Sequence, residues 1–539
     1  MIRLILIILV FLFCSHFSLA SQPIGSQQEA VRLLQQATFG PNMTAIQELQ
    51  DMGMEAWLDQ QIALPPSFHT PLVTDNYRRD SAVRLESWWH TAIWGEDQLR
   101  QRMAFALSQI LVVSQSASNL FDHQLGLINY YDLLVAHGLG NYRDLLGAVS
   151  KNAIMGRYLS YLGNQKANST QRPDENYARE LMQLFTIGMV ELNMDGSPKL
   201  NNNGQPQATY QQQDVEQFAK VFTGWCFAAP ANDRFCNSSF DFNAPMKSYD
   251  DYHDKSQKTL LNGTILAADQ SAEQDLQAAL DNLFHHDSIA PFISKQLIQK
   301  LVTSNPSPSY IERIAQIFVD NGEGVRGDLA AVAKAILLDT EARQGHLTAP
   351  TIFGKMRSPL LRMTHMWRAL NADNLADYFR IYRLSNLTAQ EPLNAPSVFN
   401  FYSADFTTAT LEAAGLLAPE FQISNESQVI HFYNYLFFPI RYGISEHVVQ
   451  GAGKTFQLYN QYQPYIDLME GIEGDEGAIE RLNLLFTGNT MSDDLKQSLR
   501  QLIIDIRVKD NARGIYDDYT AMANVMLLVM LSPEFVIQR

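Results

Sequence analysis

The chain has 539 residues, of which 46% are hydrophobic and 18% are charged, and its formal charge is −17. This is the composition of a globular protein, and the negative charge argues against a general nucleic-acid or anionic-membrane binder. The length is compatible with roughly two to four domains.

The pattern of residues 1–20 predicts an export signal, so we expect these residues not to belong to the fold. Arg3 precedes an apolar run over residues 4–13, and Ser18-Leu19-Ala20 has the small-x-small form of a leader-peptidase site. The run is too short to span a bilayer comfortably, and no later segment offers an uninterrupted apolar stretch of that length. We therefore expect cleavage after residue 20, a periplasmic or secreted location, and no transmembrane segment in the mature protein.

Two cysteines remain after this cleavage, Cys226 and Cys236. Two cysteines ten positions apart in an exported protein predict one loop disulfide. The alternative is a pair of free buried thiols, which an oxidising compartment disfavours.

Helical periodicity dominates the rest of the chain. Ser26 and Glu29 form a capping box that opens a helix through residue 36. Further predicted helices cover residues 44–52, 55–62, 97–114, 119–137, 144–149, 211–222, 271–284, 290–303, 309–321, 328–338, 355–370, 428–435, 493–506 and 520–531. The clear exception is residues 258–266, where Asn262-Gly263 between apolar flanks predicts a type I′ hairpin.

Four longer polar segments interrupt the helices. They cover residues 163–172, 195–206, 225–258 and 387–408. The longest two contain aromatic residues, which is not the composition of disorder, so we expect folded loops over the mouth of a helical body. The predicted fold class is all-α: a single large helical assembly over residues 21–539 with long capping loops and one small β-hairpin, in which residues 350–539 form a possible C-terminal helical subdomain.

Residues 174–188 predict one amphipathic helix. Asp174 can cap its first turn, Gly188 can end it, and Glu175 can pair with Arg179 at i, i+4. The stripe that we expect to be buried consists of Tyr177, Leu181, Leu184 and Phe185.

A second row on this helix, at the edge of the buried stripe, is polar: Asn176, Glu180 and Gln183. Polar side chains at such an edge are costly unless they meet partners. One interpretation is a core helix whose polar edge bonds neighbouring loops. The alternative is the floor of a functional site, with Glu180 facing a cleft.

The segment before the hairpin concentrates possible ligands, because Asp250, Asp251, His253 and Asp254 fall within five positions. Oxygen and imidazole donors suit a divalent cation. His253 and Asp254 are therefore candidate metal ligands or, with Glu180, catalytic acid–base groups of a hydrolase. The alternative is a polar loop in which His253 and Asp254 bond backbone groups, since the spacing matches no named ligand motif.

Further candidate binding residues belong to the same helix and loops. They are Asn176, Tyr177, Arg179, Asp214, Trp225 and Lys258. Asp214 also suits the first-turn electrostatics of its helix, and Trp225 is either core or a stacking surface for a sugar. Arg100 and Arg102 can bind phosphate or sulfate, or can bond helix C-termini and carboxylates.

Standard catalytic signatures are absent from the sequence: it has no GxSxG elbow, HExxH helix, P-loop or dinucleotide-binding fingerprint. Instead, the run Asn-Tyr-Ala-Arg-Glu-Leu at 176–181 and nine further runs in order resemble a large exported bacterial family known as domain of unknown function 1800. The further runs lie at residues 32–41, 57–61, 99–103, 213–225, 253–263, 291–298, 327–329, 392–399 and 532–535. The resemblance covers about residues 28–537. Many relatives carry Trp-His-Asn-His-Phe where residues 107–111 read Leu-Ser-Gln-Ile-Leu, so no role of those histidines carries over.

The resemblance implies an exported, mostly helical protein without an established reaction. Such proteins are often encoded beside another exported family, numbered 1501, that resembles sulfatases and alkaline phosphatases and is a possible partner. The first hypothesis is a binding or assembly protein of the periplasm or cell surface, acting with a partner on surface polymer and not on nucleic acid. The second is a hydrolase of uncharted type, with a divalent metal as its candidate cofactor, acting on surface polymer or its ester groups. A purely structural secreted protein is a third.

Overall fold

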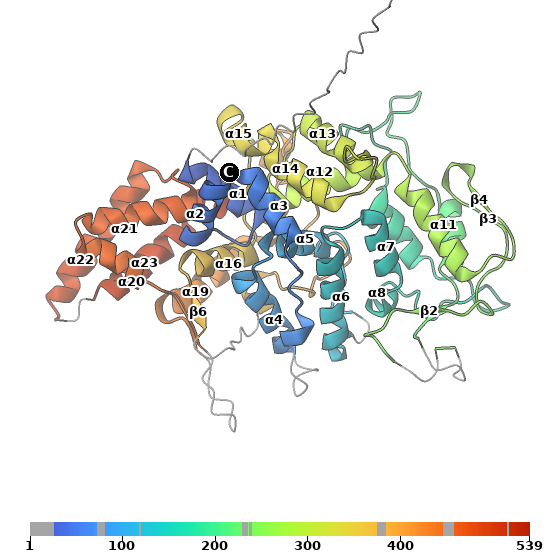
Figure 1. Cartoon of the computed structure of the whole chain (residues 1–539), viewed down its shortest axis with the longest axis horizontal. Coiled ribbons are helices and arrows are strands. Elements are labelled where there is room, and N and C mark those ends of the chain that lie inside the picture. The colour runs from blue at the N-terminus through green and yellow to red at the C-terminus, as the bar shows by residue number, and fades with distance from the viewer. Residues whose placement is uncertain are drawn as a thin grey trace, which may run out of the picture.

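The computed structural model describes residues 26–72, 81–117, 120–228, 235–236, 240–374, 384–445, 457–514 and 517–539. The predicted export signal at residues 1–20 lies outside them. The described residues confirm the predicted all-α class, because helices dominate and the strands are short (Figure 1). No helix among them is both long and apolar enough to cross a membrane.

The helices of the N-terminal part of the chain extend from the centre of the molecule towards the end that carries residues 272–284 (Figure 1). They are α1 (Gln27–Ala37), α2 (Met43–Met52), α3 (Met54–Ala63), α4 (Ser81–Trp94), α5 (Gln98–Ser108), α6 (Gln124–His137), α7 (Tyr142–Ser150), α8 (Ala153–Tyr158), α9 (Asn176–Glu180) and α10 (Gln212–Val221). Half of the predicted capping box of α1 is present, since the Ser26 hydroxyl accepts a hydrogen bond from the Glu29 N–H at 3.3 Å. Among the described residues the Glu29 side chain makes no return bond to the Ser26 N–H.

The later helices flank this centre, with α20 to α23 at one end and α11 at the other (Figure 1). They are α11 (Ala272–Phe284), α12 (Ile289–Leu301), α13 (Pro308–Val319), α14 (Leu329–Leu338), α15 (Thr340–Thr348), α16 (Pro359–Ala369), α17 (Leu384–Thr388), α18 (Ala409–Glu412), α19 (Glu426–Tyr442), α20 (Gln463–Glu470), α21 (Gly474–Leu482), α22 (Asp493–Asn511), α23 (Asp518–Leu531) and α24 (Pro533–Val536). Two π-helical segments, η4 (Leu181–Thr186) and η7 (Asn483–Thr487), and the 3₁₀ turns η1 (Thr70–Leu72), η3 (Leu120–Asp122), η5 (Leu261–Gly263) and η6 (Pro419–Ile423) complete the helical elements.

The strands form four small antiparallel sheets, where the sequence predicted a single hairpin. The pairs are β1 (Trp225–Cys226) with β2 (Lys247–Ser248), β3 (Lys258–Thr259) with β4 (Ile265–Leu266), β5 (Lys355–Met356) with β9 (Ile537–Gln538), and β8 (Gln457–Tyr459) between β6 (Asp373–Asn374) and β7 (Ile444–Ser445). The additional strands have two or three residues each, which is too short for a detectable alternation of apolar and polar residues.

The predicted hairpin is confirmed as β3–β4. Lys258 pairs with Leu266 and Thr259 with Ile265. Asn262 and Gly263 have φ angles of 57° and 72°, the two positive values that a type I′ turn requires. The predicted disulfide between Cys226 and Cys236 is also present.

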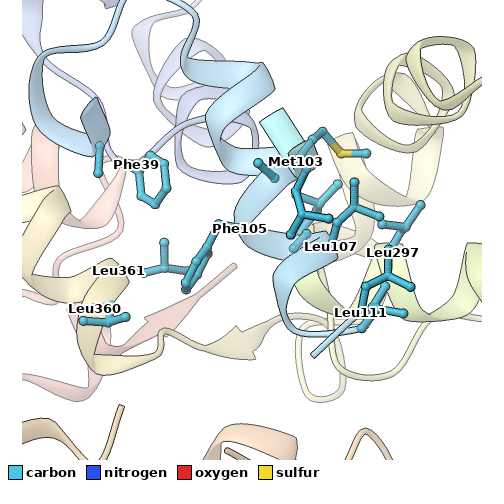
Figure 2. Packing of buried hydrophobic residues seen from close by; sticks show 14 of the residues in the cluster. Phe39, Met103, Phe105, Leu107, Leu111, Leu297, Leu360 and Leu361 are labelled. Carbon is cyan, nitrogen blue, oxygen red and sulfur yellow. The ribbon is translucent and has the colours of Figure 1, made fainter. Parts of the chain in front are cut away.

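The core is organised around α5, which contacts α1, α3, α4, α6 and α12. Figure 2 shows Phe105 of α5 beside Leu361 of α16, and Leu107 beside Leu297 of α12. Phe105 and Leu107 are at most 2% exposed. Burying such side chains contributes about 1.5–3 kcal/mol each, so α5 joins the early and late parts of the chain into one core.

The C-terminal segment returns to the N-terminal helix. Strand β9 pairs with β5 through Lys355–Gln538 and Met356–Ile537, and the end of the chain lies beside α1 (Figure 1). The Gln538 amide also donates to the Leu301 carbonyl at the end of α12, at 2.8 Å. Helix α24 and strand β9 form a wall, called here the α24–β9 wall. One pocket lies between this wall and α1, and another lies between it and α16 and α19.

Candidate functional site

The stretch predicted as one helix over residues 174–188 is α9 followed by the π-helical segment η4. The predicted pair is confirmed, since an Arg179 nitrogen lies 3.0 Å from a Glu175 carboxylate oxygen. Gly188 ends the segment at φ 73°. The Thr186 hydroxyl donates to the Leu181 carbonyl five residues earlier, at 2.7 Å, which supports the wider π turn. Single π turns frequently occur at functional sites.

Glu180, at the junction of α9 and η4, is 8% exposed, and its Oε2 has no hydrogen-bond partner. Burial raises the pKa of its carboxyl group, and the positive charge of Arg179 opposes this effect. Burial also raises the pKa of Tyr158 to about 12, with a further contribution from the Glu180 charge. A carboxyl group that keeps its proton closer to neutral pH is suited to general acid catalysis.

His253 belongs to a different, fully buried network. Its Nε2 lies 2.9 Å from Asp275 Oδ2, and its Nδ1 lies 3.0 Å from the Thr223 carbonyl oxygen. Lys258 Nζ lies 2.6 Å from the same oxygen of Asp275. Both ring nitrogens of His253 therefore already face protein oxygens. The sequence did not predict Asp275, on α11, as a partner of His253, because no local pattern connects two residues that lie twenty-two positions apart.

Asp254 does not point into this network. Its Oδ1 accepts hydrogen bonds from the N–H of Ser256 at 2.9 Å and from the Ser256 hydroxyl. Glu180 and His253 share no hydrogen-bond partner among the described residues, and no group of three or more His, Cys, Asp or Glu side chains there could hold a metal ion. The acid–base and metal assignments of Glu180, His253 and Asp254 stay predictions. The hydrogen bonds of His253 and of the Asp254 backbone N–H hold the loop before β3 against α11 and the end of α10.

The predicted binding residues do not gather in one cleft. They are Asn176, Tyr177, Arg179, Asp214, Trp225 and Lys258. Tyr177, Trp225 and Lys258 are at most 2% exposed, so they lie in the core and not on a binding surface. The Asp214 carboxylate accepts from the Gln211 N–H at 2.8 Å in the capping box that opens α10. Asn176 and Arg179 remain near the surface at the start of α9.

Arg100 and Arg102 both bond the ends of other helices. An Arg100 nitrogen donates to the carbonyls of Ile62, in the last turn of α3, and of Leu64, its C-cap, at 3.1 and 3.3 Å. An Arg102 nitrogen donates to the Lys300 carbonyl in the last turn of α12, at 2.7 Å. These contacts match the structural interpretation of the two arginines, since free carbonyls at a helix C-terminus accept from cations.

Sequence reasoning missed a buried group of charges around Arg102. Lys355 pairs with Glu420 at 2.8 Å, and both side chains are 2% exposed. The ammonium of Lys300 lies 4.5 Å from the centre of the Tyr402 ring. Burial lowers the pKa of Lys300 to about 7; the Glu420 charge opposes this, and the Lys355 and Arg102 charges add to it. The group thus has three cations and one carboxylate.

A pocket of about 400 Å³ lies next to this group, and sequence reasoning missed it as well. Its walls come from α16, η6, α19 and the segment from the end of α23 to β9. They are largely apolar, with Phe421 and Val429 partly exposed at the surface and Phe432 and Val536 among the other lining residues. The size is that of a small-molecule site.

Arg362 of α16 is the one charged residue that lines this pocket. It is 6% exposed, and its guanidinium lies 4.7 Å from the centre of the Phe432 ring. Among the described residues this guanidinium has neither an ion pair nor a hydrogen bond, and its Nε is buried without a partner. Burial alone lowers the pKa of Arg362 to about 10, so the group stays charged at neutral pH.

The sequence contains one indication of the pocket beside Arg362. Residues 342–372 contain Arg343, Lys355, Arg357, Arg362 and Arg368 but no Asp or Glu. A run of cations without acids indicates charges that need partners from elsewhere in the chain. The pocket itself could not be found this way, because its walls come from three distant parts of the chain.

Comparison with known families gives one match. The model of a family described as "Protein of unknown function (DUF1800)" matches residues 32–537. No curated protein and no solved structure matches the chain. The match covers nearly all of the chain, and its description assigns no reaction, ligand or partner, so the geometry of the sites carries the functional argument.

Proposed function

The chain belongs to the DUF1800 family, and from its structure we propose that it is an exported binding protein for a carboxylate with an apolar body. The pocket beside Arg362 is the binding site. Export rests on the signal pattern of residues 1–20. A partner from the sulfatase-like exported family, suggested by the earlier resemblance, is part of the proposal, and such a protein would receive or deliver the bound ligand.

The observation that carries this proposal is the unpaired guanidinium of Arg362 in an apolar pocket. Removing a charge from water without a partner costs several kcal/mol, so Arg362 destabilises the empty protein relative to an apolar side chain. An anionic ligand removes this cost, because it supplies the missing charge and hydrogen-bond acceptors. The same arrangement gives the site selectivity, since an uncharged ligand would leave the guanidinium unpaired.

The pocket also restricts the body of the ligand. Apolar side chains such as Phe421, Phe432 and Val536 line it, so an alkyl or aryl group is favoured over a sugar. The planar guanidinium matches a carboxylate, with which it forms two parallel hydrogen bonds. The Gln428 side-chain oxygen, buried without a partner, is available to a hydroxyl or amide N–H of the ligand.

Replacing Arg362 by Met tests the proposal. Titration calorimetry of the mature protein with decanoate should show saturable binding, decanol should bind much more weakly, and Arg362→Met should lose at least about tenfold in decanoate affinity. Without ligand, Arg362→Met should unfold at a higher denaturant concentration, with a gain of about 1–4 kcal/mol, because a buried unpaired charge is removed.

The matched control is Arg500→Met, because Arg500 is exposed and paired with Glu476 at 2.6 Å. This variant should bind decanoate as the unaltered protein does. Equal affinity for decanoate and decanol, or undiminished binding by Arg362→Met, would contradict the proposal.

Hydrolysis is a second candidate function, and the observations that favour it all concern one residue, Glu180. Its unbonded Oε2, its raised pKa and its position at a π turn fit a general acid. Glu180→Gln should then abolish turnover of a chromogenic ester, glycoside or sulfate without unfolding the protein, and Glu175→Gln, one turn away on the exposed side, should not. Absence of turnover in the unaltered protein on all three substrate classes would leave binding as the function.

A further inference from the structure

A second pocket lies on the other side of the α24–β9 wall. Its volume is about 120 Å³, and Pro533 and Ile537 line both this pocket and the larger one. Helix α1 provides another wall, in agreement with the position of the chain end beside α1 in Figure 1. This volume is much smaller than that of the pocket beside Arg362 and is large enough for a small ion.

Two buried arginines, Arg32 and Arg357, line this pocket and are 6% and 3% exposed. Arg32 donates to the Arg343 carbonyl at 3.2 Å and contacts the ring of His346, while its Nε has no partner. Arg357 donates to the carbonyls of α24 and β9. Neither guanidinium forms an ion pair among the described residues, so both of their charges remain uncompensated.

The ionisable groups around Arg32 and Arg357 do not compensate the charges of these two arginines. Burial lowers the pKa of Arg32 to about 10, and the negative charge of Glu29 partly opposes this without contacting it. His346 adds no charge near pH 7, because burial and the neighbouring Arg32 and Arg343 lower its pKa to about 4. A third arginine, Arg539, also lines the pocket.

Glu534 is the one Asp or Glu side chain among the described residues that line the pocket, and it is engaged elsewhere. Its two oxygens accept from the N–H and the hydroxyl of Ser492 at 2.9 and 2.6 Å, where α22 begins. By contrast, the Nε2 amide of Gln35, which is 8% exposed and lines the same pocket, is a buried donor without a partner. The pocket therefore presents unused N–H donors, and the described residues that line it offer no unengaged Asp or Glu side chain.

We propose that this pocket binds a small tetrahedral oxyanion, phosphate or sulfate, either free or as the end group of an ester. Arg32, Arg357 and Gln35 supply the donors, and four oxygens around one centre can accept from all three residues at once. A chloride ion has the charge but lacks separate acceptor atoms for the donors of three residues. This site is separate from the carboxylate pocket, and neither proposal depends on the other.

The test uses the mature protein with phosphate, sulfate or chloride at constant ionic strength. Phosphate or sulfate should bind saturably in calorimetry and raise the melting temperature, since a ligand that binds only the folded state stabilises it. Chloride should do neither. Adding phosphoserine and 4-nitrophenyl sulfate distinguishes the two sources: binding of an ester as tight as that of its free anion indicates an end group, and much weaker binding indicates the free ion.

Gln35→Glu gives the sharpest variant. A carboxylate at this position supplies the missing counter-charge, so the variant should melt at a higher temperature without anion and should no longer respond to sulfate or phosphate. Arg32→Gln should weaken anion binding at least tenfold, and the exposed control Arg500→Gln should leave it unchanged. The proposal is wrong if chloride acts as strongly as sulfate, which would indicate an adventitious ion only, or if Gln35→Glu retains the full anion response.

Discussion

Lys300 illustrates how a single buried cation should make the stability of this protein depend on pH. Its pKa in the folded protein is lowered to about 7 by burial, against a usual value of 10.5. Between these two values the unfolded chain holds a proton that the folded protein has lost, so the free energy of unfolding rises with pH. The rise from this group is at most about 1.4 kcal/mol per pH unit. Below pH 7 both states are protonated, and the cost of the buried charge is fully present.

We therefore expect Lys300→Met to stabilise the protein at pH 6.5, by an amount that decreases towards pH 9. Urea denaturation of both proteins at the two pH values measures this difference. The control is Lys496→Met, because Lys496 lies near the surface and pairs with Glu480 at 2.5 Å. Unfolding free energies of Lys300→Met and the unaltered protein that stay parallel from pH 6.5 to 9 would show that Lys300 titrates normally.

At the scale of single elements, Gly224 shows why the junction after α10 tolerates no side chain. Gly224 has a φ of 81°, and a Cβ atom there would lie 2.9 Å from the Tyr249 carbonyl oxygen and 3.0 Å from the His253 nitrogen. The loop that carries His253 therefore packs directly on the backbone at the end of α10. This close approach is the reason for a glycine, in addition to the helix end that the sequence indicates.

Gly224→Ala should lower the free energy of unfolding by about 2–4 kcal/mol, because the positive φ and the close contacts act together. Gly204→Ala is the matched control, since Gly204 has a φ of 73° but no atom within 4 Å of a Cβ. It should cost only about 1 kcal/mol, from the backbone conformation alone. Thermal denaturation compares the two, and equal losses would mean that the contact with the His253 loop contributes nothing.

Local patterns predicted three features correctly, whereas the helix predicted over 97–114 ends at Ser108 and the one predicted over 355–370 begins only at Pro359, after strand β5. The cap at Ser26, the turn at Asn262-Gly263 and the pair Glu175–Arg179 each depend on residues within a few positions, and all three are present. The π turn after Glu180 was missed, because the same apolar spacing fits an α-helix.

Candidate sites were harder to predict than elements, because their residues meet only after folding. Asp275, on α11, contacts His253, which lies in the loop before β3. Arg362 lines its pocket together with side chains from two segments far along the chain. A single sequence identifies residue types but not which of them lie together. The lack of acids around Arg362 was visible in the sequence, whereas the pocket was not.

At the scale of the whole molecule, the last strand connects elements from several parts of the chain. Strand β9 pairs with β5, Gln538 donates to the end of α12, and Arg357 donates to the Ile537 carbonyl. Helix α16 also reaches the N-terminal part, since Arg368 donates to the carbonyls of Gly40 and Ile93 at 2.7 and 2.6 Å. Residues 350–539, considered as a possible subdomain, therefore share buried contacts with the N-terminal helices.

These shared contacts predict a single cooperative unfolding transition for the mature protein. In scanning calorimetry, the calorimetric and van't Hoff enthalpies should agree. Removal of residues 537–539 should lower the free energy of unfolding by about 2–4 kcal/mol and shift the whole transition, because strand pairing and buried hydrogen bonds are lost together. Gln538→Ala should have a smaller effect, since it keeps the backbone pairing with β5 and removes only the amide contacts to α12. Two separate transitions, of which only one responds to the truncation, would instead identify residues 350–539 as an independent domain.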